Sequence, residues 1–132
     1  MYRIILAAVD WSDRAEPVLR KAARLGEVFG SRVHLFHCVV LEGSAPLPGA
    51  AERAALERLE ELAALYPEVW IEEPRLASNA PWRDIVEAAT RLDADLIVLG
   101  AHAHDGWDRL FGKTADKVFD RAGRDCLVVE QP

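Results

Sequence analysis

Apolar residues alternate along the chain between continuous runs and stretches with helical spacing. Short apolar runs bounded by turn residues are typical of buried strands. The predicted strands are Arg3–Val9, Arg32–Leu41, Ala94–Leu99 and Asp125–Glu130. A weaker, more polar run at Val69–Ile71 and the residues after it predicts an edge strand.

The stretches between these runs have the periodicity of amphipathic helices. In the first stretch Val18, Leu19, Ala22 and Leu25 fall on one helical face, and Pro81 suits the first turn of a later helix. The predicted helices are Ala15–Phe29, Ala50–Leu65, Pro81–Leu92 and Thr114–Arg121, and the long loops are Glu42–Gly49 and Gly100–Phe111.

Strict alternation of strands and helices predicts an α/β fold with a doubly wound parallel sheet. The length of 132 residues fits one domain, 1–132, with a single sizeable core. No internal repeat or low-complexity tract divides the sequence.

Composition and charge narrow the class of protein. A hydrophobic fraction of 51% argues against disorder, and a net charge of −6 without a basic patch argues against a nucleic-acid partner. No apolar run approaches the roughly 20 residues of a membrane span, and the N-terminus leads directly into a strand, so we expect a cytoplasmic protein. Cys38 and Cys126 lie in apolar runs and are expected to be free, buried thiols.

Candidate chemistry lies where predicted strands end, because open α/β sheets bind ligands at the carboxyl ends of their strands. Asp10 follows the first strand, where its carboxylate could accept hydrogen bonds from a ribose hydroxyl or an exocyclic amine. The alternative is that Asp10 caps the next helix, a role that Ser12 or Asp13 could also take.

The triplet Gly112-Lys113-Thr114 opens a predicted helix, where free N–H groups favour an anion. It is not a P-loop, because five residues rather than four separate it from Gly106, and it does not directly follow a strand. Phosphate could still rest on the N–H groups of Lys113 and Thr114. The alternative is that Thr114 is only the N-cap of the helix.

Other reactive residues show no catalytic or metal-binding pattern. His102 and His104 are expected to be solvated in a loop, and His34 and His37 fall on opposite faces of one strand. The sequence contains no nucleophile elbow and no evident acid/base pair, so we expect a protein without strong catalytic apparatus. Trp82 and Trp107 lie in or beside predicted loops and could cover a ligand or partner, with packing as the default.

Taken together, the segments resemble the universal stress protein family over nearly the whole chain. The resemblance rests on the order and spacing of Ile4–Ser12, Pro81–Val86, Ala94–His102, Thr114–Val118 and Cys126–Val129. It implies a five-stranded parallel sheet of order 3-2-1-4-5 with helices on both faces, and a homodimer, often formed through the last strand, here 125–130.

One branch of this family binds ATP or AMP through a signature of Gly, two residues, Gly, nine residues, Gly and then Ser or Thr. Gly100 matches the first position of the signature, but Ala103 replaces the second glycine. Between Ala103 and Gly112 there are eight residues instead of nine, and Lys113 is inserted between Gly112 and Thr114. Thr114 is as far from Gly100 in sequence as the Ser or Thr of the signature is from its first glycine. The following Ala115–Val118, however, aligns better with the family when one residue is deleted, so two alignments stay open. The stretch Gly106–Leu110 is similar to the branch that lacks the signature.

The resemblance implies specific contacts if ATP or AMP, with Mg²⁺, is bound. Asp10 would meet adenine or ribose, and Ala8 and Cys38 would line the base pocket. Ribose and phosphates would be surrounded by Leu99, Gly100, Ala103, Gly112, Lys113 and Thr114. The leading hypothesis is a small non-catalytic regulatory protein of the stress response. A slow ATPase or phosphotransfer protein and a nucleotide-free interaction module are the alternatives.

Overall fold

The computed structural model describes residues 2–9, 15–39, 50–71, 75–76, 80–101 and 116–130. Its elements in chain order are β1 (Ile4–Val9), α1 (Ala15–Phe29), β2 (Arg32–Val39), α2 (Ala50–Ala63), β3 (Trp70–Ile71), β4 (Arg75–Leu76), α3 (Pro81–Leu92), β5 (Leu96–Ala101) and β6 (Asp125–Glu130). Residues 116–121 are also helical. None of the helices in these ranges is long and apolar enough to cross a bilayer.

The strands form one parallel sheet in the order β3-β2-β1-β5-β6, with β4 also paired to β2. This order confirms the predicted 3-2-1-4-5 arrangement, with β5 and β6 as its fourth and fifth strands. The weak third strand is at the sheet edge as predicted, but it consists of two short pieces, β3 and β4.

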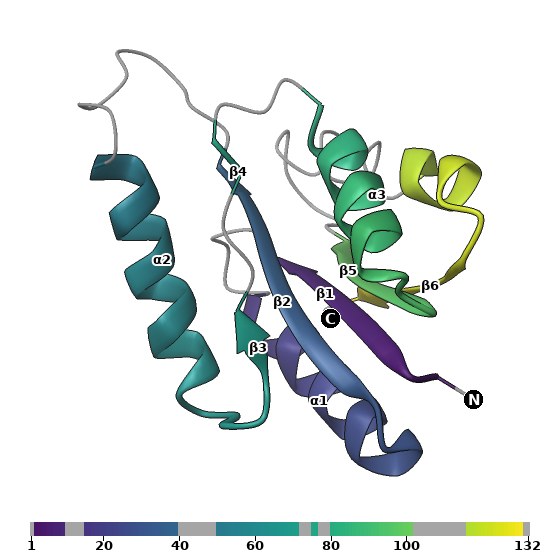
Figure 1. Cartoon of the computed structure of the whole chain (residues 1–132), viewed down its shortest axis with the longest axis horizontal. Coiled ribbons are helices and arrows are strands. Elements are labelled where there is room, and N and C mark those ends of the chain that lie inside the picture. The colour runs from purple at the N-terminus through teal and green to yellow at the C-terminus, as the bar shows by residue number, and fades with distance from the viewer. Residues whose placement is uncertain are drawn as a thin grey trace.

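Helices cover both faces of the sheet (Figure 1). On one face α1 and α2 pack over inward-facing residues of the strands, including Ile5, Ala7 and Val98. On the other face α3 and the helical residues 116–121 pack over Leu6, Ala8 and Leu99. The two cores alternate along β1 because successive side chains of a strand point to opposite faces.

The fourth predicted strand is displaced in the structure. The sequence predicted a strand over Ala94–Leu99, whereas β5 begins at Leu96 and continues through Gly100 and Ala101. Asp93 adopts the left-handed conformation at the end of α3, with φ 54° and ψ 47°, which a short polar side chain tolerates. The chain therefore needs Ala94 and Asp95 to pass from the helix into the sheet. Gly100 extends the strand because it pairs with Val129 of β6.

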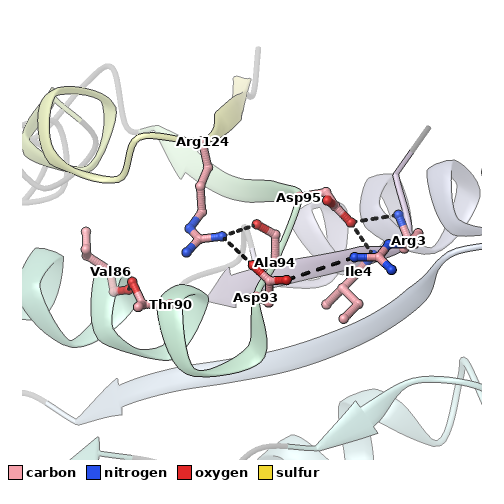
Figure 2. A network of polar contacts seen from close by, with 8 residues as sticks. All are labelled: Arg3, Ile4, Val86, Thr90, Asp93, Ala94, Asp95 and Arg124. Carbon is pink, nitrogen blue, oxygen red and sulfur yellow. Dashed lines mark hydrogen bonds and ion pairs between the residues drawn. The ribbon is translucent and has the colours of Figure 1, made fainter.

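The edge of the sheet where β1 and β5 begin carries a dense polar network, which we call the amino-edge clamp: Arg3, Asp93, Asp95 and Arg124 (Figure 2). The Asp95 carboxylate accepts hydrogen bonds from the backbone N–H groups of Arg3 and Ile4 at 2.8 and 3.0 Å. The guanidinium of Arg124 donates to the carbonyl of Ala94 at 2.7 Å and lies 3.6 Å from the Asp93 carboxylate. The clamp fixes the starts of β1 and β5 and thereby their relative register.

Candidate functional site

The direction of chain connection reverses between β1 and β5. From β1 the chain builds outward through β2 to β3, and it then returns through α3 to add β5 and β6 on the other side of β1. Such a switch point leaves a crevice at the carboxyl ends of the two strands, the usual ligand position in open α/β sheets. The candidate site is therefore the carboxyl ends of β1 and β5.

Strand pairing brings the backbones of four predicted site residues together at this switch point. Ala8 of β1 lies directly opposite Leu99 of β5, and Gly100 follows Leu99 in the same strand. Cys38 is a backbone neighbour on the other side, one residue beyond His37, which pairs with Val9 at the end of β1. Strand pairing thus brings together positions about 30 and 90 residues apart in sequence.

The side chains of Ala8 and Leu99 belong to the core at this point. Their exposed fractions are 2% and 0%, and both pack in the cluster beneath α3. They therefore form an apolar wall at the switch point, and polar recognition must come from groups at the strand ends. The side chain of Cys38 and residues Asp10, Ala103, Gly112, Lys113 and Thr114 lie outside the described part.

A buried histidine at this edge was missed as a site residue. His37 is 3% exposed, and its Nδ1 lies 2.8 Å from the backbone oxygen of Val9. Since a carbonyl oxygen only accepts hydrogen bonds, Nδ1 carries the proton and donates it. The imidazole fixes the last carbonyl of β1, immediately before Asp10. The sequence signal for His37 was an ionisable residue in an apolar run. Pattern alone does not show that His37 lies beside Val9 at the end of β1.

Several other predictions about reactive residues can be compared with the structure. His34 and His37 occupy positions of opposite parity in β2, as predicted, and both are buried. Cys126 is a free thiol but is only partly buried, because its strand β6 lies at the sheet edge, and the remaining burial raises the pKa of the thiol. Trp82 lies in the first turn of α3, as the predicted helix Pro81–Leu92 implies, and it packs against the core as the default interpretation held.

Tyr2, Tyr66, Asp95 and Cys126 have shifted pKa values, and these four groups lie away from the switch point. Hydrogen bonds from the N–H groups of Ile4 and Arg3 lower the pKa of Asp95 at the opposite edge. Within the described ranges, no group of three or more His, Cys, Asp or Glu side chains could hold a metal ion. His102, His104 and Trp107 lie outside these ranges, as do the candidate caps Ser12 and Asp13.

Comparison with known proteins gives a consistent family relationship. The universal stress protein family matches residues 1–130. Universal stress protein A homolog 1 of Coxiella burnetii is 30% identical over 139 aligned positions, covering 97% of this chain and 96% of the relative. These matches cover nearly the full length of both sequences, so the similarity concerns the whole domain.

Solved structures agree with the fold. The universal stress protein of Archaeoglobus fulgidus in complex with dAMP is 29% identical, covers 97% of each chain and superposes with a TM-score of 0.67. A universal stress protein in complex with cAMP superposes with a TM-score of 0.72 at 23% identity, covering 99% of this chain and 98% of the other. The second similarity shows the shared fold alone.

Proposed function

The chain belongs to the universal stress protein family, and on that premise we propose that it binds an adenine nucleotide, ATP or AMP, at the switch point between β1 and β5. The observation that carries the proposal is the pairing of Ala8 with Leu99, which sets the carboxyl ends of these strands side by side. A related chain that is 29% identical was solved in complex with dAMP, which supports an adenine nucleotide as the ligand class.

The proposed contacts assign different parts of the nucleotide to different residues. Asp10 accepts hydrogen bonds from adenine or ribose, and the apolar groups of Ala8 and Cys38 lie against the base. Leu99, Gly100 and Ala103 are placed near the ribose. Phosphates lie at Gly112, Lys113 and Thr114, where the ammonium group of Lys113 adds charge complementarity and Mg²⁺ could offset the remaining charge.

Two features adjust the expected affinity in opposite directions. Ala103 in place of glycine adds a methyl group where backbone is expected to approach the phosphates, which is costly if that residue needs a positive φ. Lys113 supplies a cation that the glycine signature itself does not require. We therefore expect micromolar binding, with AMP and ATP distinguished by the contribution of Lys113.

Isothermal titration calorimetry with AMP, ADP and ATP, each with and without Mg²⁺, tests the proposal. Asp10→Ala is expected to weaken binding at least tenfold, and Lys113→Gln to weaken ATP more than AMP, because ATP places more charge near the ammonium group. Glu57→Ala, which removes an exposed carboxylate on α2, is the matched control and should leave the affinity unchanged. Absence of heat at protein concentrations near a millimolar would refute nucleotide binding.

The same measurement separates a regulatory binding protein from a slow ATPase. We propose a non-catalytic protein that signals through its nucleotide state in the stress response of the cytoplasm. Phosphate release assayed over hours with saturating ATP is expected to match the buffer blank. Steady release that disappears in Asp10→Ala would assign the protein to the ATPase class instead.

We also propose that the chain forms a homodimer through β6. This strand pairs only with β5 among the described strands, so its other edge carries unpaired backbone N–H and C=O groups. Residues Cys126 to Val129 are partly buried on both faces of the sheet. A second copy adding its own β6 would satisfy the edge groups and cover these apolar side chains.

Sedimentation velocity at micromolar concentration tests the dimer. Val128→Lys, which places a charge on the β6 edge, is expected to convert the dimer to a monomer. Val28→Lys adds the same charge at a site on α1 that is 76% exposed and should leave the dimer intact. A wild-type protein that sediments only as a monomer would contradict the proposal.

A further inference from the structure

Three cationic side chains surround one tryptophan on the α3 face of the molecule. The Arg83 and Arg121 guanidinium carbons lie 5.5 and 5.3 Å from the centroid of the Trp82 ring, and the Lys117 ammonium nitrogen lies 5.5 Å from it. Trp82 and Arg83 come from the first turn of α3, and the other two cations from the helical residues 116–121. We call these four residues the Trp82 cluster.

The cluster concentrates positive charge on a protein that is acidic overall. Because each cation lies within 5.5 Å of the same ring centroid, any two of them are at most about 11 Å apart, a separation comparable to the Debye length of about 10 Å at 0.1 M salt. All three side chains are exposed, whereas Trp82 is partly buried against the core. The indole face attracts each cation, but a neutral ring cannot cancel the repulsion between three like charges.

No carboxylate neutralises these cations within the described residues. The ion pairs found there join other groups, Arg3 and Arg124 with Asp93, and Arg20 with Glu16. Asp84, Asp116 and Asp120 are neighbours in sequence, yet none of them lies within ion-pair distance of the cluster. The three exposed cations are therefore accessible to an external anion.

We propose that the Trp82 cluster is a docking surface for a short acidic segment of a partner protein. Tryptophan and arginine are among the residue types most enriched at protein-binding hot spots. The net charge of −6 disfavours an extended polyanion such as nucleic acid or an anionic membrane, whereas three cations around one ring match the charge of a short acidic segment.

The cluster and the proposed nucleotide site consist of different residues. The cluster is made of helical side chains of α3 and of residues 116–121, whereas the proposed nucleotide contacts lie at strand ends and in the loops that follow them. Because Lys117 follows Thr114, a proposed phosphate contact, by only three residues, the docking surface is tested without nucleotide. Asp10→Ala, which removes a proposed contact to adenine or ribose, should leave acidic-segment binding unchanged.

Fluorescence anisotropy of a fluorescein-labelled hexaglutamate peptide, titrated with the full chain at low salt, tests the surface. The double variant Lys117→Gln/Arg121→Gln is expected to raise the Kd about tenfold, and Arg83→Gln to raise it several-fold. Each substitution removes a cation that attracts the glutamate carboxylates of the peptide. The matched control is Lys21→Gln/Arg24→Gln, which removes two exposed cations from α1 and should change the Kd less than twofold.

Further variants and competing ligands in the same titration test whether the partner is an acidic protein segment. Trp82→Phe keeps an aromatic ring with a weaker attraction for cations and is expected to reduce affinity modestly without unfolding the protein. Equal weakening by the α1 control would show a net-charge effect and overturn the proposal. Displacement of the peptide by millimolar inorganic phosphate, or preferential binding to phosphatidylserine vesicles, would also overturn it, because the site would then recognise any anion or a membrane surface.

Discussion

At the amino edge of the sheet, polar side chains are engaged in holding the strands together, whereas at the carboxyl edge the described residues are apolar or fix a single carbonyl. Asp95 and Arg124 bind backbone groups at the starts of β1 and β5. Ala8 and Leu99 contribute only buried hydrocarbon to the other end of the same two strands. The difference teaches that strand register is fixed at one edge, which leaves the other available for a ligand.

The two edges also differ in the role of their ionisable groups. Asp95 gains hydrogen bonds from backbone N–H groups in the folded state, and its lowered pKa records that gain. His37 at the carboxyl edge donates to Val9 and thereby orients the end of β1. The amino edge should therefore respond strongly to mutations that affect stability, and the carboxyl edge to mutations that affect binding.

Removal of the Asp95 carboxylate should give the largest stability effect at the amino edge. Asp95→Ala leaves the N–H groups of Arg3 and Ile4 without their acceptor, so the free energy of unfolding should fall by about 1–3 kcal/mol. Asp95→Asn keeps one oxygen acceptor and should cost less. Urea denaturation measures both, and AMP affinity should not change, because the clamp lies at the edge opposite the proposed site.

A charge-matched control separates hydrogen bonding from net charge. Glu27→Ala removes an exposed carboxylate from the last turn of α1 and should leave stability nearly unchanged. If Asp95→Ala were as stable as Glu27→Ala, the amino-edge clamp would not hold the sheet. If it lowered AMP affinity without unfolding the protein, the two edges would not be independent.

Packing near the amino edge should make a helix glycine intolerant of substitution. An added Cβ at Gly26 of α1 would lie 2.7 Å from Cγ2 of Val33 in β2. Alanine normally favours a helix over glycine by about 1 kcal/mol, but this overlap should reverse the sign and cost about 1–3 kcal/mol. Thermal unfolding of Gly26→Ala measures the net effect.

Val33→Ala, which removes the methyl group that an added Cβ at Gly26 would contact, provides the control. In a Val33→Ala background, Gly26→Ala should cost much less, because the contacting methyl group is gone. Equal cost in both backgrounds would locate the strain elsewhere. A stabilising Gly26→Ala in the wild type would show that α1 can shift away from the sheet.

Acid should weaken the amino edge, with a smaller effect than either mutation. The pKa of Asp95 is lowered in the folded state, first by the N–H groups of Ile4 and Arg3. A group with a lowered folded pKa contributes stability above its unfolded pKa of about 3.9 and loses it as pH falls through the folded pKa. The urea midpoint should therefore decrease below about pH 4, and less steeply in Asp95→Asn. An identical slope in that variant would exclude Asp95 as a source of the pH dependence.

Sequence pattern alone predicted the order of elements and the face of α1 that enters the core. The bounds of α1 and β6 agree with the predicted Ala15–Phe29 and Asp125–Glu130, because apolar periodicity and turn residues act locally. The end of the fourth strand was predicted less well. Asp93 in the left-handed conformation delays β5, and pairing with Val129 extends the strand through Gly100.

The residues proposed for the candidate site stay predictions, and Asp10 and Gly112 lie outside the described ranges. Asp10, Gly100 and Gly112 were identified by their positions after strands and before a helix, which are properties of the chain itself. The role of His37 could not be predicted, because it depends on the register that sets Val9 of β1 against β2. The cations around Trp82 were missed for a similar reason, since residues 83, 117 and 121 meet only after two helices pack on one face.

The sequence by itself determined the class of fold, the two-faced core and the end of the sheet where a ligand is expected. Tertiary structure decided which distant polar groups meet: the carboxylate of Asp95 with the start of β1, the imidazole of His37 with its end, and three cations with one indole. The physical reason is the sequence separation of the groups that interact. Hydrophobic periodicity and turn preferences are set by neighbours in the chain, whereas hydrogen bonds and charge clusters need atoms a few ångströms apart that only strand register and helix packing bring together.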